Sequence, residues 1–326
     1  MRRRDLIKVT GLAAAWPLAA RAQQAPAVPV IGLLLPLSLS AAARNIEAFR
    51  SGLHDLGYFE GRNYTLEFRF ADGFFERLPK LAVELVALKP ALIIAGSPPA
   101  TVAVHKATQT IPIVMNMSQD PVGLGVAASL SRPGSNVTGF WWGDEHLVGK
   151  QLELLTKAVP GITRIGFFDI PNDPTFGSIL KSLPATSAAL GLETRVINVR
   201  GPSDLDSAFA TAKRENLQAL LIGTGPFFVS HRAEVTALAA KAKLPALYGI
   251  REFVLAGGLM SYGTDLANLY REMARLVDKI FKGASAADLP IERPNKFELL
   301  INLKAAKALG LTFSPSFLAT ADEVVE

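Results

Sequence analysis

The feature of this sequence that most constrains its fold is a regular alternation of short apolar runs with longer amphipathic segments. Residues 92–95 (Leu-Ile-Ile-Ala) are apolar throughout, as in a strand whose two faces are both covered by helices. The alternation predicts parallel strands joined by helical crossovers. In the first half we expect strands at 30–36, 65–71, 91–97 and 111–117, and helices at 45–56, 75–88 and 99–108.

The same pattern restarts after a long amphipathic segment at 147–159. It predicts strands at 164–170, 194–199, 219–223, 246–250 and 258–262, with helices at 175–190, 205–216 and 230–242. We therefore expect an α/β protein with two Rossmann-like lobes, each built on a parallel sheet, and a ligand cleft between them. Lobe one is expected to comprise 24–140 and about 264–290, and lobe two 141–263. Residues 291–326 should form a last strand, helix and tail, with no lobe assigned.

Two helices carry more specific expectations. Pro184 lies inside the expected helix 175–190 and predicts a kink or a break there, because proline lacks a backbone donor and clashes with the preceding turn. The segment 265–281 has apolar residues at helical spacing. It should cover the core of a lobe and not contact a ligand.

The amino terminus has the order of a cleavable signal peptide. Basic residues precede a short apolar run at 9–20, which ends in Ala20-Arg21-Ala22. The run is shorter than the roughly 20 residues of a membrane-spanning helix, so we expect cleavage near Ala22. Arg3 and Arg4 fit the twin-arginine pattern, and an ordinary Sec signal is the alternative.

Removal of residues 1–22 takes away most of the excess positive charge and leaves a nearly neutral chain. A basic surface for nucleic acid is therefore not expected. The sequence has no cysteine, which excludes disulfides, thiolate chemistry and a lipidated anchor. These features predict a periplasmic protein that is monomeric and not anchored to the membrane.

Motifs that would indicate catalysis or a bound cofactor are missing. The loop after the first expected strand has no glycine, and neither a P-loop nor a nucleophile elbow is present. The four histidines lie in different expected helices without ligand spacing. We expect no metal ion and no cofactor.

Ligands of open parallel sheets bind beyond the carboxyl ends of the strands, so polar residues of those loops are the candidate site. A zwitterionic ligand would suit their mixture of carboxylates, hydroxyls and an arginine. Structural alternatives exist: Asp120 as a helix cap, Asn172 and Asp173 as a turn, and Arg251 paired with Glu252 on the surface. The candidates are Ser38, Ser97, Thr101 and Asp120 in lobe one, and Asn172, Asp173, Thr224, Arg251 and Glu252 in lobe two.

Ordered blocks along the whole chain resemble one protein family. Two departures are small: Ser135 stands where a second glycine is usual, and 284–286 lacks a common proline. The matching blocks are 16–24 (WPLAARAQQ), 57–64 (GYFEGRNY), 111–114 (IPIV), 120–122 (DPV), 132–139 (RPGSNVTG), 152–155 (LELL), 256–263 (AGGLMSYG), 278–283 (DKIFKG), 288–290 (DLP), 297–304 (FELLINLK), 305–311 (AAKALGL) and 321–326 (ADEVVE). In these blocks the chain is similar to ABC-transporter substrate-binding proteins of the type I periplasmic-binding-protein fold, a group that includes tryptophan- and tyrosine-binding members.

The resemblance implies capture of a small molecule between two lobes and its delivery to an ABC permease, without catalysis. The ligand it suggests is an amino acid or an aromatic or other organic acid. Two alternatives stay open from the residues. One is a receptor domain that serves a periplasmic sensor, and the other is a secreted α/β enzyme using Asp120, Asp173 or Glu252 as a general acid or base.

Overall fold

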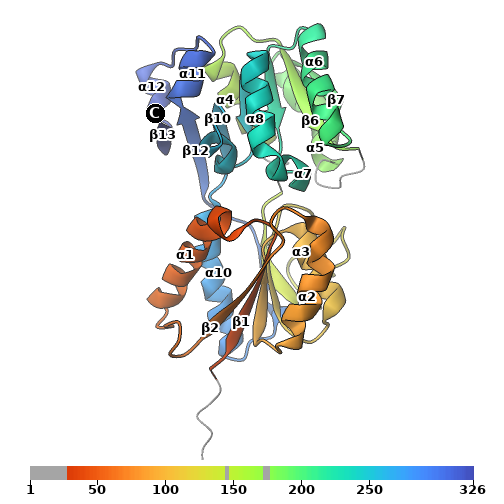
Figure 1. The fold of residues 1–326 in the computed structure, drawn as a ribbon, viewed down its shortest axis with the longest axis vertical. Helices are drawn as coiled ribbons and strands as arrows, with labels where there is room; N and C mark the ends of the chain where they lie inside the picture. The colour runs from red at the N-terminus through yellow and green to blue at the C-terminus, as the bar shows by residue number, and fades with distance from the viewer. Residues whose placement is uncertain (1–27, 144–146, 172–176) are drawn as a thin grey trace, which may run out of the picture.

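The computed structural model describes residues 28–143, 147–171 and 177–326. Two sheets, each flanked by helices, lie one beyond the other along the long axis of the molecule (Figure 1). We call the sheet nearer the amino terminus, with its helices, lobe one, and the other lobe two. The described segments therefore form two α/β lobes of similar construction, as the alternation of apolar runs and amphipathic segments predicts.

The sheet of lobe one is parallel at every pairing. Its six strands follow the spatial order β11-β5-β4-β3-β1-β2. The strands are β1 (Val30–Leu35), β2 (Thr65–Phe70), β3 (Leu92–Ala95), β4 (Ile113–Met117), β5 (Val137–Trp141) and β11 (Ile291–Glu292), and the helices are α1 (Leu39–Asp55), α2 (Leu78–Ala87), α3 (Pro98–Ala107) and α10 (Leu266–Phe281).

The sheet of lobe two has one antiparallel pairing, between β10 and β12, in an otherwise parallel arrangement. Its order is β13-β12-β10-β9-β8-β6-β7. The strands are β6 (Arg164–Asp169), β7 (Glu193–Asn198), β8 (Ala219–Ile222), β9 (Ala246–Tyr248), β10 (Met260–Thr264), β12 (Phe297–Asn302) and β13 (Glu323–Val325). The helices are α4 (Val148–Ala158), α5 (Gly177–Ala189), α6 (Leu205–Arg214), α7 (Pro226–Ser230), α8 (Arg232–Ala242), α9 (Arg251–Leu255), α11 (Leu303–Ala308) and α12 (Pro315–Leu318), with short 3-10 turns at Phe75–Arg77, Pro202–Asp204 and Ala286–Asp288.

The carboxyl-terminal segment 291–326 divides between the two lobes. Strand β11 pairs with β5 in lobe one, whereas β12 and β13 extend the sheet of lobe two. Between β10 and α10, and again between β11 and β12, the chain passes from one lobe to the other. The antiparallel pairing arises because β12 enters lobe two along the path by which β10 leaves it.

Helix α10 covers the core of lobe one, which confirms that part of its prediction. Asp265 caps it by accepting the Asn268 N–H (3.1 Å), and its face toward α1 is buried. Gly52 of α1 lets the two helices approach closely, since a Cβ there would lie 2.4 Å from the Arg271 carbonyl oxygen. The predicted break in the second lobe is absent, because α5 runs from Gly177 to Ala189 with Pro184 inside it.

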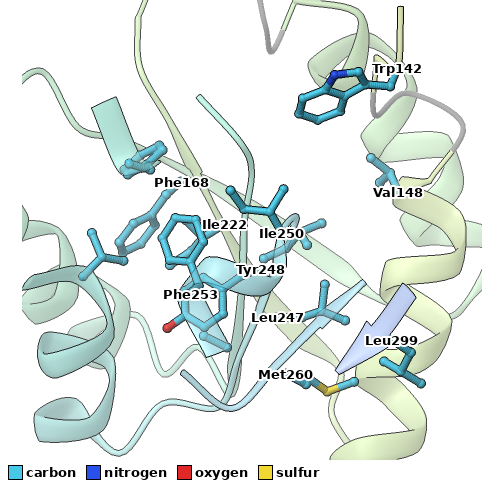
Figure 2. Packing of buried hydrophobic residues seen from close by; sticks show 14 of the residues in the cluster. Trp142, Val148, Phe168, Ile222, Leu247, Tyr248, Ile250, Phe253, Met260 and Leu299 are labelled. Carbon is cyan, nitrogen blue, oxygen red and sulfur yellow. The ribbon is translucent and has the colours of Figure 1, made fainter. Parts of the chain in front are cut away.

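Aromatic stacking marks the centre of the lobe-two core. Tyr248 and Phe253 lie with ring centroids 4.6 Å apart and an interplanar angle of 8° (Figure 2). Both side chains are fully buried, so the short helix α9 packs directly on the end of β9. Within the described residues, none of the helices has the length and apolar character that a bilayer crossing requires.

Candidate functional site

The junction between the lobes is formed by loops that follow strands. In lobe one, α1 and α3 begin after β1 and β3; in lobe two, α7 and α9 begin after β8 and β9. Helix α7 lies at the end of lobe two that faces lobe one (Figure 1). Both sets of strand ends therefore point toward the other lobe, where open parallel sheets bind their ligands.

Three of the candidate residues of lobe one hold the first turns of helices. Ser38 caps α1 by accepting the Ala41 N–H (3.4 Å), and Ser97 caps α3 by accepting the Ala100 N–H (3.2 Å). Thr101 is fully buried and donates to the Ser97 carbonyl oxygen (2.9 Å). Each hydroxyl thus has a local structural bond.

The remaining candidates differ in burial. Asp120 is exposed and accepts the Val122 N–H (3.0 Å) within a turn; no helix follows it in the described stretch before β5, so the alternative interpretation of Asp120 as a helix cap is wrong. Thr224 is buried just after β8. Asn172 and Asp173 lie outside the described residues.

Arg251 makes two ion pairs, and neither is with Glu252. Its Nη1 donates to Glu298 Oε2 and its Nη2 to Glu323 Oε2, each at 2.7 Å. Burial opposes the charge, but the bonds to Glu323 and Glu298 together raise the pKa of Arg251 above its ordinary value. Only Nε of this buried guanidinium has no hydrogen-bond partner among the described residues. Arg251 is therefore held inside lobe two and is not a surface residue.

Glu252, the next residue, places an unsatisfied carboxylate oxygen at the junction. The side chain as a whole is partly buried, but its Oε2 is shielded from solvent and accepts no hydrogen bond from any described residue. Burial raises the pKa of Glu252; its own backbone N–H and the charges of Arg251, Arg44 and Arg232 lower it by less. A buried acceptor of this kind is costly unless a donor reaches it.

A polar group of lobe one lies near this carboxylate. Burial raises the pKa of Tyr270 to about 12, a hydrogen bond with Asn116 lowers it, and the charge of Glu252 raises it. Asn116 also accepts the Trp142 indole N–H (2.5 Å). Gly96 leaves room for this group, because a Cβ there would lie 2.7 Å from the Tyr270 hydroxyl.

Sequence reasoning missed Asn116, Trp142 and Tyr270 as members of the junction. Asn116 is inside a strand, and Tyr270 is on a helix whose apolar spacing indicated only a core role. One signal was available: Asn116 is the single polar residue in the run Ile113–Met117. A polar side chain in an otherwise apolar buried strand needs a hydrogen-bonding partner nearby.

The lobes are also joined by charge. Arg44 of α1 lies 3.6 Å from Glu298 of lobe two and 3.7 Å from Asp265, which precedes α10. Glu298 is thus shared between Arg44 of lobe one and Arg251 of lobe two. Among the described residues, no three histidine, aspartate or glutamate side chains lie together so that they could hold a metal ion.

A hollow of about 420 Å³ lies elsewhere, between α2 and α3. Its lining is mostly apolar and comes from lobe one alone; Lys106 is its charged member. A ligand that bridges two lobes needs groups from both, so the junction at Glu252 is the stronger candidate site.

The family model for ABC transporter substrate binding proteins matches residues 30–325, nearly the whole chain. The chain belongs to this family. A curated relative, the tyrosine-binding protein of Clostridioides difficile (strain R20291), is 28% identical over 265 residues, which cover 81% of this chain and 76% of that protein.

Solved structures share the fold. A conserved domain protein from Vibrio cholerae has a TM-score of 0.80 at 25% identity, over 91% of this chain and 99% of the other. A domain from Streptococcus pneumoniae in complex with L-Trp also has a TM-score of 0.80, at 24% identity and the same coverage. The type I periplasmic-binding-protein fold and the role of a solute-binding protein of an ABC importer, both expected from the sequence, are confirmed.

Proposed function

We propose that the junction between the lobes binds an amino acid with an aromatic side chain and that closure of the lobes around it presents it to the permease. Two-lobed binders work by binding ligand more tightly in one arrangement of the lobes than in the other. The protein itself acts as an exported, unanchored monomer and returns its ligand chemically unchanged.

The observation that carries this proposal is the buried Oε2 of Glu252. An ammonium group placed against it supplies the missing hydrogen-bond donor and a compensating charge. Arg251, the cation nearest in sequence, already donates to Glu298 and Glu323. A ligand cation is therefore the partner that best satisfies Glu252.

The neighbouring groups suit the remainder of an aromatic amino acid. The rings of Trp142 and Tyr270 lie beside Asn116, and we place the ring of the ligand next to them because aromatic side chains favour stacked or edge-to-face contacts with one another. For the ligand carboxylate we propose hydroxyls of the strand-end loops, namely Ser38, Ser97 and Thr224. Pro98 and Pro99 have no backbone N–H, so the start of α3 lacks two hydrogen-bond donors. The hydroxyl of Ser97 is the donor that this helix end can offer to the ligand carboxylate.

The remaining candidates from the sequence have secondary roles in this proposal. Asp120 belongs to the rim of the junction, and Thr101 supports the turn that carries Ser97. Asn172 and Asp173, outside the described residues, stay candidate ligand contacts from the sequence alone. The relatives add weight to the ligand class: one is named for tyrosine, and another was solved with L-Trp.

Native mass spectrometry of the protein freshly purified from its host's periplasm tests the proposal. We expect a bound species with the mass of an aromatic amino acid, recovered unaltered after denaturation. A co-purified sugar or fatty acid would contradict the ligand class. Conversion of an added aromatic amino acid to another compound would contradict the assignment as a binder and favour the enzyme.

A further inference from the structure

Strand β13 meets the candidate site through Glu323, which accepts a hydrogen bond from Nη2 of Arg251 (2.7 Å). We infer that Glu323 of β13 is a positioning residue, which sets the Glu252 carboxylate by holding Arg251. This inference rests on the proposed function, in which Glu252 receives the ligand's ammonium group.

Helix α9 is too short to be stable by itself. It has five residues, begins at Arg251 and follows β9 after two residues. A single helical turn is not stable without outside contacts. Phe253 anchors one side of α9 by stacking on Tyr248. The side that carries Arg251 needs a second anchor.

Glu323 and Glu298 supply that anchor from two neighbouring strands. Each carboxylate accepts a hydrogen bond from one Nη of Arg251 at 2.7 Å. The guanidinium is therefore held between β12 and β13. Charged hydrogen bonds at two nitrogens of a planar group restrict its orientation as well as its position. Because Glu252 is the next residue along the backbone, the direction of its side chain depends on this hold.

Glu298 and Glu323, the two acceptors of Arg251, differ in how far their side chains are exposed to solvent. The side chains of Arg251 and Glu298 are 9% and 11% exposed, whereas that of Glu323 is 45% exposed. Removal of Glu298 would leave a buried arginine without its main counter-charge and would threaten the fold. Removal of Glu323 withdraws one acceptor at the surface, so a Glu323 variant should fold.

The experiment compares Glu323→Ala with Glu326→Ala, which removes the same charge from an exposed position of the same tail. Carboxyl ¹³C NMR follows the titration of Glu252 in the ligand-free proteins, and calorimetry measures their affinity for L-tryptophan. Glu252 is flanked by Arg251 of α9, Arg44 of α1, Arg232 of α8 and the Tyr270 hydroxyl of α10. Glu323 is not among these groups, so we expect its loss to reach Glu252 mainly through movement of α9.

In Glu323→Ala we expect the Glu252 carboxyl to gain access to water, its pKa to fall toward the ordinary value, and L-tryptophan to bind about tenfold more weakly. Glu326→Ala should titrate and bind as wild type. An unchanged Glu252 titration in Glu323→Ala would overturn the inference, as would unchanged affinity in a protein that binds L-tryptophan. If wild type fails to bind any aromatic amino acid, the proposed function falls, whereas the NMR comparison still decides the role of Glu323.

Discussion

Gly263 of β10 lies directly against Gly249, which follows β9: a Cβ at Gly263 would be 1.7 Å from the Gly249 carbonyl oxygen. No side chain fits in that space, because the obstructing atom belongs to the backbone. The contact joins the strand that leaves lobe two to the loop that leads into α9. It therefore helps to fix the position of α9, with Arg251 and Glu252, relative to the segment between β10 and α10 where the chain passes to lobe one.

Gly263→Ala should separate β9 from β10 and destabilise the protein by about 1–3 kcal/mol, the usual cost of forcing extra volume into a packed site. Urea unfolding measures the loss. Gly201→Ala is the control, since no atom lies within 4 Å of a Cβ at that position and its backbone is extended. Equal stability of the two variants would contradict this account of the β9–β10 contact.

Two helical glycines should respond to alanine with opposite signs. Gly52→Ala gains the helix propensity of alanine but meets the Arg271 carbonyl oxygen, so we expect a net loss of about 1–3 kcal/mol. At Gly149 of α4 the nearest atom, Thr186 Cγ2, would lie at an ordinary 3.6 Å. Gly149→Ala should therefore raise the free energy of unfolding by about 0.5 kcal/mol. Stabilisation by Gly52→Ala, measured by thermal unfolding, would show that α1 and α10 are not tightly packed there.

Ligand binding should release a proton under mildly acidic conditions. Burial raises the pKa of Glu252 in the free protein, and a bound ammonium group favours the charged carboxylate and lowers that pKa. At a pH between the pKa of Glu252 in the free protein and its pKa in the complex, binding releases a proton. The affinity for the ligand therefore falls as the pH drops through the pKa of Glu252 in the free protein. Calorimetry in buffers of different ionisation enthalpy detects the release. Glu252→Gln should abolish it, and persistence of the release in that variant would assign the proton to another group.

Export makes a separate prediction from residues outside the described structure. Protein from the native periplasm should begin at Gln23, because Ala20 and Ala22 supply small residues at the cleavage site. Amino-terminal sequencing checks it, and an intact Met1 in the periplasmic protein would contradict it. Replacing Arg3 and Arg4 by lysine should block export if the twin-arginine route is used.

The fold could be predicted from the sequence because its information is local. Each short apolar run and each amphipathic segment indicates its own element, and the chain order of strands and helices then implies two parallel sheets. The antiparallel pairing of β10 with β12 could not be read in this way. It depends on where residues 291–326 return after lobe one, which no local pattern specifies.

The candidate site was predictable only to the level of its loops. Ser38 and Ser97 were correctly placed at strand ends, but their spacing before a helix also fits the caps that the structure shows. The partners of Arg251 lie 47 and 72 residues away, at Glu298 and Glu323. Because an ion pair over such a separation leaves no periodic pattern, the sequence could not show that Arg251 is held by two carboxylates while Oε2 of Glu252 has no donor among the described residues.

The most direct test of the central claim is a calorimetric titration of L-tryptophan and of indole-3-propionate, which lacks the ammonium group, into wild type and Glu252→Gln. Glu326→Gln, which removes the same charge from an exposed position away from the junction, is the control. We predict that wild type and Glu326→Gln bind L-tryptophan but not the propionate, and that Glu252→Gln loses about 1.5–3 kcal/mol of binding free energy, the value of a hydrogen bond to a charged group. Equal affinity of wild type and Glu252→Gln for L-tryptophan would contradict the claim that this carboxylate holds the ligand.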